Sequence, residues 1–216
     1  MGWKLPQTRL ELVCDLSNNR RMNVNSSGCI YLIRHGETEW ALSGQHTGRT
    51  DIPLTANGEA AARKLGLKLK EVVFTRVLTS PRLRARRTGE LAGVQPAAEV
   101  EPDLAEWDYG DYEGLRSAEI LKARPDWNIY HDGCPHGESP VEIAGRADRL
   151  IVRLRSLTGN VALFSHGHFG RVLAARWIGL PVTEAQRFQL DTATLSILGY
   201  EHDRVKSPVI ALWNAQ

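Results

Sequence analysis

Two short apolar segments of the sequence are each followed, one residue later, by the dipeptide His-Gly. Cys29–Ile33 runs into Arg34-His35-Gly36, and Val161–Phe164 runs into Ser165-His166-Gly167. Apolar runs of this length are typical of strands buried in a sheet, and in parallel sheets ligands bind beyond the carboxyl ends of the strands. We therefore expect both imidazoles to face one pocket. The glycine after each His would let the backbone approach a ligand and offer an unhindered N–H to an anion.

Strand-like and helix-like segments alternate along the rest of the chain. Helical patterns mark Thr55–Leu69, Arg82–Leu91, Ser139–Leu157 and a segment from the second His-Gly pair to about Ile178, and further strand-like runs are Val72–Leu78, Thr192–Gly199 and Val209–Leu212. Such alternation favours parallel strands with helices on both faces of the sheet. The predicted fold class is α/β, a three-layer α/β/α sandwich with a mainly parallel central sheet flanked by helices.

Residues 1–28 differ in composition from the rest. Four asparagines lead into Ser26-Ser27-Gly28, a polar cluster typical of a loop or flexible tail. We predict a flexible N-terminal extension over residues 1–28 and a single domain over residues 29–216. Met22 leaves open that the native chain starts within this extension.

Charge and cysteine content exclude several classes of protein. The chain of 216 residues carries 27 Lys and Arg against 25 Asp and Glu, a net charge of +2, which gives no reason to expect a nucleic acid as partner. Three sparse cysteines without C-x-x-C spacing predict a reducing, cytoplasmic environment and no structural metal site. No apolar run approaches the roughly 18 residues of a membrane helix, and no signal-peptide core is present.

Positive charge is concentrated after the second strand-like segment. Arg82, Arg84, Arg86 and Arg87 lie within six residues. Most of them are expected on a solvated face, but one residue per turn can point inward beside Arg34 and form a fork for phosphate oxygens. No aromatic residue interrupts the run, which argues against a surface for single-stranded nucleic acid. The pattern leaves open which arginine points inward.

A carboxylate completes the set of candidate groups. Leu104–Gly114 is acidic, aromatic and marked by glycine, which predicts a loop that holds Glu106 near the pocket. Two histidines, at least two arginines and a carboxylate fit phosphoryl transfer through a covalent histidine intermediate. Guanidinium groups then stabilise the charge that Mg²⁺ stabilises elsewhere, so we predict neither metal nor cofactor. A metal-dependent hydrolase using His35, His166 and His168 is the alternative, disfavoured because no ligand cluster has compact spacing.

Taken together, these motifs resemble the signature of the histidine phosphatase (phosphoglycerate mutase-like) superfamily. The matching segments are Arg34–Thr38 with Trp40, Thr47–Thr55, Ser80…Arg84-Ala85…Thr88, Glu106…Tyr109-Gly110 and His166-Gly167. The resemblance covers about residues 29–213 and implies a phosphoglycerate mutase-like fold. It also implies a phosphorylated nucleophile at His35, phosphate contacts from Arg34, Arg84 and His166, and a general acid at Glu106. The implied substrate-binding set is Thr47, Gly48, Tyr109, Gly167 and Arg171.

Within the superfamily, the chain is most similar to the sedoheptulose-1,7-bisphosphatase-like subgroup. The compact stretch with Trp127–Cys134 and Gly137-Glu138-Ser139 carries this similarity, and Arg171 then implies contact with a second phosphate. Phosphoglycerate mutases have an Asn after the motif tryptophan, where this chain has Ala41. We therefore predict a metal-independent phosphatase for a small sugar phosphate or bisphosphate, with no nucleic acid or membrane as partner.

Two other functions stay open. One is phosphoglycerate mutase-type phosphoryl transfer, in which the phosphoryl group returns to the substrate instead of passing to water. The other is a non-catalytic phosphate-binding module. His46 is an open candidate for substrate contact, whereas His131 and His136 are expected in an exposed loop. The oligomeric state is not predicted.

Overall fold

A mixed sheet of six strands forms the centre of the protein in a computed structural model that describes residues 28–201 and 207–216. The strands are β1 (Ile30–Arg34), β2 (Phe74–Thr79), β3 (Glu99–Val100), β4 (Asn160–Ser165), β5 (Leu195–Tyr200) and β6 (Pro208–Ala215), in the spatial order β3-β2-β4-β1-β5-β6. The first four strands of this order run parallel, whereas β5 pairs antiparallel with β1 and β6 antiparallel with β5. The predicted, mainly parallel sheet is confirmed: the two predicted late strands join it antiparallel at one edge, and the two-residue strand β3 was not predicted.

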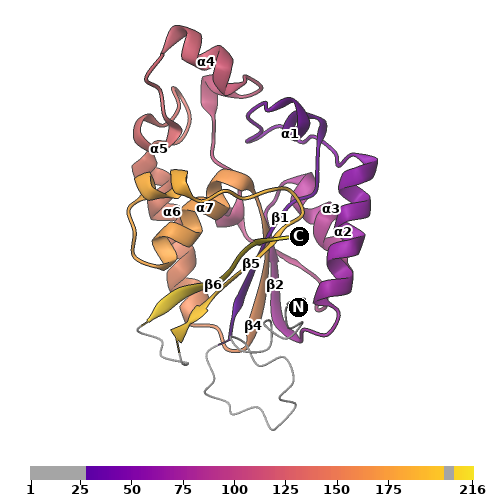
Figure 1. The fold of residues 1–216 in the computed structure, drawn as a ribbon. Helices are drawn as coiled ribbons and strands as arrows, with labels where there is room; N and C mark the ends of the chain where they lie inside the picture. Colours follow the sequence, from indigo (N-terminus) through magenta and orange to yellow (C-terminus); the bar gives the residue numbers. More distant parts are fainter. Residues whose placement is uncertain (1–27, 202–206) are drawn as a thin grey trace, which may run out of the picture.

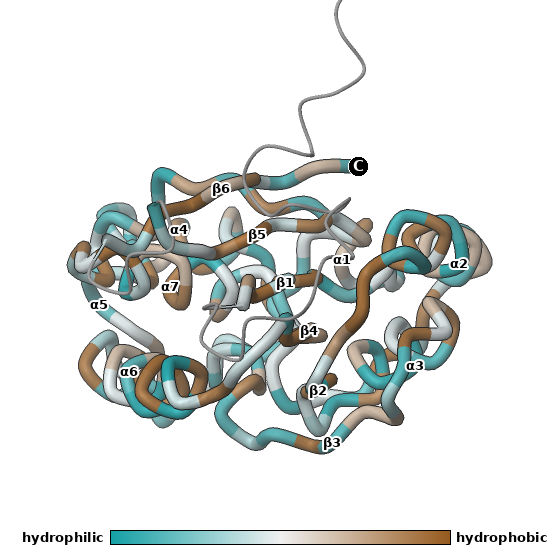
Figure 2. The backbone as a smooth tube through the Cα atoms, turned by 90° about the horizontal axis from the view of Figure 1, so that it is seen from below, coloured by the Kyte–Doolittle hydropathy of each residue, from teal (hydrophilic) through white to brown (hydrophobic). Residues whose placement is uncertain are grey.

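Helices cover both faces of this sheet (Figures 1 and 2). On one face lie α2 (Ala56–Leu69) and α3 (Leu83–Ala92), and on the other α6 (Pro140–Arg155) and α7 (Gly167–Trp177). Successive residues of β1 point to opposite faces, so Tyr31 and Ile33 join the core under α2 and α3, while Ile30 and Leu32 join the core under α6 and α7. Burial on both faces explains why this strand is a continuous apolar run. The predicted three-layer fold is confirmed.

Polar caps determine where the long helices begin. The Thr55 hydroxyl accepts the N–H of Gly58 at the start of α2. At the start of α6, Ser139 and Glu142 form a capping box in which each side chain accepts the other residue's N–H. The sequence patterns did not predict the shorter elements α1 (Glu39–Ser43), α4 (Ser117–Ala123), α5 (Ile129–Asp132), η1 (Pro102–Leu104), η2 (Gly110–Tyr112) and η3 (Val182–Arg187). These elements are too short to show a helical period.

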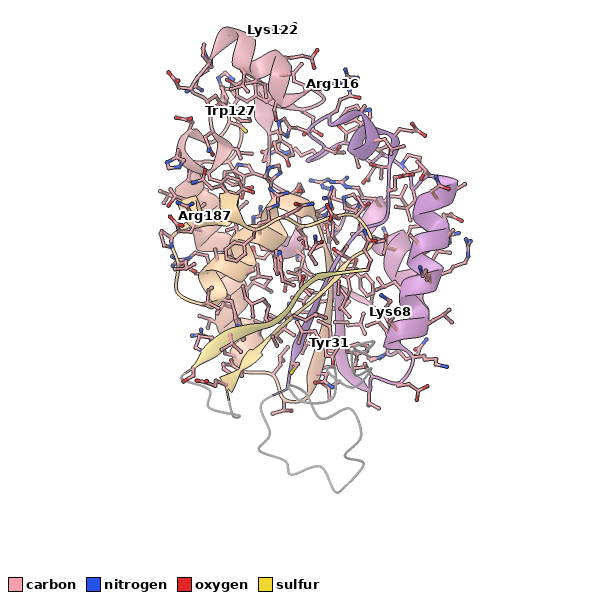
Figure 3. All side chains as sticks on the ribbon, viewed as in Figure 1. Tyr31, Lys68, Arg116, Lys122, Trp127 and Arg187 are labelled. Atoms are coloured by element: carbon pink, nitrogen blue, oxygen red, sulfur yellow. The ribbon has the colours of Figure 1, made fainter. Side chains whose placement is uncertain are left out.

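The carboxyl ends of β1, β2 and β4 meet at one edge of the sheet. The N–H of His35 donates to Ser165 O (3.0 Å), and the N–H of Ser80 donates to Phe164 O (2.9 Å), so the segments that follow these strands lie next to one another. Above this edge stand α1, α4 and α5 (Figure 1). Arg116 and Trp127, labelled in Figure 3, mark the segment that carries α4 and α5. A bridge between Gln45 and Arg116 connects this segment to the end of α1.

Two sequence predictions concern regions with little or no described structure. The predicted N-terminal extension, apart from Gly28, and the alternative start at Met22 lie outside the described residues.

Among the helices of residues 28–201 and 207–216, none has the length and apolar character needed to cross a membrane.

Two helical glycines offer a test of the packing between α2 and α3. A Cβ on Gly66 would lie 2.3 Å from the carbonyl oxygen of Ala92 in α3, whereas a Cβ on Gly145 in α6 would meet only Arg149 Nη1, at 3.9 Å. Gly66→Ala should lower the free energy of unfolding by about 1–3 kcal/mol because it overpacks this contact. Gly145→Ala should raise it by about 0.5–1 kcal/mol, since alanine is the better helix former. Urea unfolding of both variants measures the difference, and stabilisation by Gly66→Ala would contradict the observed helix contact.

Candidate functional site

Two buried imidazoles lie side by side where β1 and β4 end. His35 follows β1 and His166 follows β4, and the centroids of their rings are 5.2 Å apart. His35 is 5% exposed and His166 is completely buried. The structure therefore brings together the two histidines that the sequence motifs singled out.

One ring nitrogen of His35, Nδ1, forms a hydrogen bond to the backbone. Its Nδ1 lies 2.7 Å from the carbonyl oxygen of Gly36. Because a carbonyl oxygen only accepts, Nδ1 carries the proton of the neutral ring and Nε2 keeps its lone pair. Burial, and then the positive charges of Arg84 and Arg34, lower the pKa of His35 well below its ordinary value. The neutral ring with a free Nε2 is the form that acts as a nucleophile.

The glycines after the two histidines make close contacts within the protein. The N–H of Gly36 donates to the Thr88 hydroxyl (2.9 Å), and a Cβ on Gly36 would lie 2.6 Å from Gly58 O. The expectation of a free N–H for an anion is thus wrong for Gly36, whose close approach is to the start of α2. A Cβ on Gly167 would lie 3.3 Å from Cζ of Arg34, so this glycine makes room for a guanidinium group.

In His166, one ring nitrogen forms a hydrogen bond and the other does not. His166 Nε2 lies 2.7 Å from the hydroxyl oxygen of Ser80. Its Nδ1 is buried and has no hydrogen-bond partner within the described residues. Burial, together with the charge of Arg84, lowers the pKa of His166 well below its ordinary value, so this ring is also neutral.

Two guanidinium groups lie beside these rings. Arg84 is completely buried and donates to the carbonyl oxygens of Thr50 (3.0 Å), Thr47 (2.7 Å) and Gly48 (3.2 Å), while Arg34 Nη1 donates to Leu190 O. The Nε atoms of Arg34 and Arg84 are buried and unpartnered within the described part of the chain. Burial lowers the pKa of both arginines, and the negative charge of Glu106 opposes this effect. Buried donors without acceptors are rare and costly, so these donors favour an anionic ligand.

Of the remaining arginines of the run after β2, Arg86 and Arg87 lie at the surface, whereas Arg82 has a buried Nε without a hydrogen-bond partner in the described residues. Arg86 is exposed, and Arg87 forms an ion pair with Glu59 at 3.2 Å. Arg82 is half-buried at the cap of α3. The structure thus identifies Arg84 as the inward-pointing residue that the helical pattern alone left open.

The side chain of Glu106 reaches the start of α7, and three backbone N–H groups donate to its carboxylate there. Oε1 accepts from Trp107 (2.9 Å) and Phe169 (2.8 Å), and Oε2 accepts from His168 (3.0 Å). Two of these donors belong to the first turn of α7, which is a favourable place for a negative charge. The contacts hold the carboxylate in one orientation at the edge of the pocket.

An ion pair between Arg146 and Glu138 supports the loop that carries Glu106. Arg146 from α6 donates to both carboxylate oxygens of Glu138 (2.9 and 2.7 Å) and to the carbonyl oxygens of Asp103 (2.8 Å) and Ala105 (2.6 Å). The indole N–H of Trp107 donates to Glu138 O (2.9 Å). Nothing in the sequence indicates a role for Arg146, because the groups to which it donates lie 8 and about 40 residues away along the chain.

A cleft of about 220 Å³ opens above these groups. Of the predicted catalytic residues, Arg34, His35 and Glu106 line this cleft, while Arg84 and His166 are not among its lining residues. Thr47, Tyr109, Gly167 and Arg171 from the predicted substrate-binding set also line it. Gly48 does not; its N–H donates to the Glu113 carboxylate (2.9 Å) and its carbonyl accepts from Arg84.

The outer wall of the cleft contains residues that the motifs did not assign. They are Trp40, Gln45 and Ser117, with His168 and the open candidate His46. His168 Nδ1 lies 2.7 Å from the Tyr109 hydroxyl, and the His46 ring stacks on Tyr109 with centroids 4.7 Å apart. Burial lowers the pKa of both histidines below the ordinary value, so this wall is uncharged at neutral pH. Trp40 belongs to a matched motif, and Gln45, His46 and His168 stand beside one, whereas nothing in the sequence pointed to Ser117.

The other candidate histidines lie elsewhere. His131 and His136 are exposed, as expected, and His136 pairs with Asp111 at 2.9 Å. In the described residues, no group of three or more His, Cys, Asp or Glu side chains is arranged to hold a metal ion. The alternative of a metal centre built on His35, His166 and His168 therefore has no geometric support there.

Comparison with known proteins agrees with this geometry. The Histidine phosphatase superfamily (branch 1) matches residues 30–216. An acid phosphatase from Mycobacterium tuberculosis is 42% identical over 187 residues, which cover 85% of this chain and 92% of that protein. Sedoheptulose 1,7-bisphosphatase from Saccharomyces cerevisiae is 34% identical over 253 residues, which cover 85% of this chain and 91% of that protein.

A solved structure extends the comparison to the fold. The product of open reading frame Rv3214 from Mycobacterium tuberculosis superposes with a TM-score of 0.81 at 39% identity, over 88% of this chain and 98% of that one. The predicted family, fold and enzyme class are thereby confirmed. The chain belongs to branch 1 of the histidine phosphatase superfamily.

Proposed function

We propose that the chain is a metal-independent phosphatase that hydrolyses small phosphorylated metabolites through a phosphohistidine on His35. One observation carries this proposal. The ring of His35, neutral and with Nε2 free, lies beside the His166 ring, and the buried Nε–H groups of Arg34 and Arg84 and the buried Nδ1 of His166 have no hydrogen-bond partner in the described residues. A phosphoryl group at this point would accept from these donors while Nε2 attacks its phosphorus. The names of the two curated relatives, an acid phosphatase and a sugar bisphosphatase, support the same function.

In the first half-reaction, the Nε2 lone pair forms a bond to phosphorus and the bond to the leaving oxygen breaks. The arginines balance the charge on the equatorial oxygens, as metal ions do in other phosphoryl-transfer enzymes. Glu106 supplies the proton that the leaving alkoxide takes. Since Glu106 Oε1 already accepts two N–H groups, this proton would be carried on Oε2, which accepts only one.

In the second half-reaction, water attacks phosphorus and the bond between phosphorus and Nε2 breaks. Glu106 takes one proton from the water, inorganic phosphate leaves and His35 returns to its neutral form. In a mutase the phosphoryl group would instead return to the organic substrate. Ala41 supports hydrolysis, because it places a methyl group on the cleft wall where phosphoglycerate mutases have an amide.

The outer cleft supports a sugar phosphate as substrate. Its wall offers neutral groups that can bind sugar hydroxyls: the side chains of Gln45, His46, Ser117 and His168. Arg171 adds a positive charge beside them, held by a contact from its Nη1 to the Tyr130 hydroxyl (3.3 Å). A distal phosphate on a sugar bisphosphate would pair with this guanidinium group.

Replacing the nucleophile tests the proposed function. His35→Ala should abolish phosphate release from a panel of phosphorylated metabolites, and should also abolish the acid-labile phospho-enzyme, because the variant lacks the Nε2 atom that forms the bond to phosphorus. Phosphate release is measured colorimetrically, and the phospho-enzyme by rapid quench. Wild-type activity should survive EDTA. Retained turnover in His35→Ala would refute the mechanism, and isomerisation of 3-phosphoglycerate without hydrolysis would favour the mutase alternative.

The pH profile tests the state of His35. Acid protonates Nε2 and removes the nucleophile, and the lowered pKa of His35 shifts this loss to pH values well below 6.5. Between pH 7 and pH 5, kcat/KM should therefore not show the roughly tenfold decrease per pH unit that a histidine with a pKa near 6.5 would cause. The substrate's own second ionisation is measured separately and divided out. An acid limb centred near pH 6.5 after this correction would contradict the neutral nucleophile.

Arg171 tests the substrate class. Arg171→Met should lower kcat/KM for a sugar bisphosphate by about tenfold to a hundredfold, the effect of losing a hydrogen bond to a charged group. The monophosphate of the same sugar is the matched control and should be affected much less. Equal losses for the two substrates would show that Arg171 does not contact a distal phosphate.

A further inference from the structure

The completely buried side chain of Ser80 holds the second histidine of the site. Both residues are 0% exposed, and the Ser80 hydroxyl oxygen lies 2.7 Å from His166 Nε2. This contact follows from the sheet: β2 and β4 are neighbours, and the N–H of Ser80 donates to Phe164 O (2.9 Å), two residues before His166. His166 Nδ1 has no partner within the described residues and is the ring nitrogen left to meet a phosphoryl group on His35.

The direction of the bond between Ser80 and His166 decides which nitrogen of His166 carries the proton. The Ser80 oxygen already accepts the backbone N–H of Arg82 at 3.2 Å. In one arrangement, the Ser80 hydroxyl donates to Nε2, and the imidazole proton resides on Nδ1. In the other, Nε2–H donates to Ser80, and Nδ1 presents a lone pair. The ring is neutral in both arrangements.

Hydrogen-bond satisfaction distinguishes these arrangements. If Nε2–H donated to Ser80, two buried groups would lack partners in the described residues, namely the Ser80 proton and the Nδ1 lone pair. If Ser80 donates, only Nδ1–H is left, and a phosphoryl oxygen can accept from it. Buried polar groups are rarely left unpaired, because each one costs its full desolvation free energy.

We propose that Ser80 is a positioning residue that donates its hydroxyl proton to His166 Nε2 and thereby keeps Nδ1–H directed to the phosphoryl group. This inference rests on the proposed function, in which the phosphoryl oxygens accept from His166. The opposite tautomer would place a lone pair against an oxyanion, which repels it and removes one donor from the transition state. Ser80 thus acts through His166 and does not itself contact the substrate.

Nitrogen NMR of the wild-type protein gives the first test. With ¹⁵N-labelled histidine at pH 7, the His166 signals, assigned by their loss in His166→Gln, should show a protonated Nδ1 and an unprotonated Nε2. A protonated Nε2, or an imidazolium ring, would overturn the proposal. This measurement needs no turnover, so it decides the tautomer even if the wild-type protein hydrolyses no phosphomonoester, a result that would count against the proposed function instead.

Substitution of Ser80 gives the second test. Ser80→Ala should produce a mixture of His166 tautomers and lower kcat/KM by the factor by which the Nδ1–H tautomer is depleted, about twofold for equal populations. Ser80→Thr keeps the hydroxyl and should restore the Nδ1–H tautomer. Wild-type tautomer and activity in a folded Ser80→Ala variant would overturn the proposal.

Ser165→Ala is the matched control for loss of a buried hydroxyl. Ser165 is also completely buried at this edge of the sheet, but its hydroxyl donates to Leu104 O (2.8 Å). The variant should lose stability in thermal unfolding and keep the His166 tautomer. A tautomer change in Ser165→Ala as large as that in Ser80→Ala would show that the effect is general loosening of the edge, and would overturn the specific role of Ser80.

Discussion

Two positive charges, Arg34 in the wall of the cleft and the completely buried Arg84 behind it, determine how the rest of the site is arranged. A buried guanidinium group is costly unless acceptors surround it. Arg84 meets this requirement through three carbonyl oxygens of the segment that follows α1, and Glu106 supplies the opposing charge. Burial, together with the same positive charges, lowers the pKa of His35 and of His166 and keeps both rings neutral. The pocket is therefore complementary to an anion before any substrate binds, and the proposed nucleophile His35 stays unprotonated.

The loop that carries Glu106 depends on a scaffold behind the cleft. Arg146 and Glu138 form an ion pair that is mostly buried and makes further hydrogen bonds to the backbone on either side of Glu106. This scaffold presses the loop against the first turn of α7, where the Glu106 carboxylate meets three N–H groups. The orientation of Glu106, the proposed general acid, thus depends on Arg146 and Glu138, which are not among the residues that line the cleft.

The central fold could be predicted from the sequence because its signals are local. β1 and β4 are continuous apolar runs, and α2 and α6 begin at residues whose side chains cap them. The meeting of His35 with His166 followed from the rule that parallel strands end at one edge. The inward direction of Arg84 did not follow from its helix, since the carbonyl oxygens that surround it come from 34 to 37 residues earlier in the chain.

The outer cleft could not be predicted for a similar reason. Gln45, His46 and Ser117 belong to short helices and connections without periodicity, and a bridge between Gln45 and Arg116 brings their segments together. The prediction that the Gly36 N–H binds an anion was wrong, because a glycine allows the close approach of another protein backbone as readily as that of a ligand. In the structure its neighbour is Gly58, 22 residues later.

In the proposed mechanism, the hydrogen bond between His35 Nδ1 and the Gly36 carbonyl leaves Nε2 as the nucleophile. The direct measurement is the position of the phosphoryl group on the histidine ring, obtained from phosphorus–nitrogen couplings in a trapped, ¹⁵N-labelled phospho-enzyme. We expect a single phosphohistidine with phosphorus on Nε2 of His35. Phosphorus on Nδ1, or on any other residue, would contradict it.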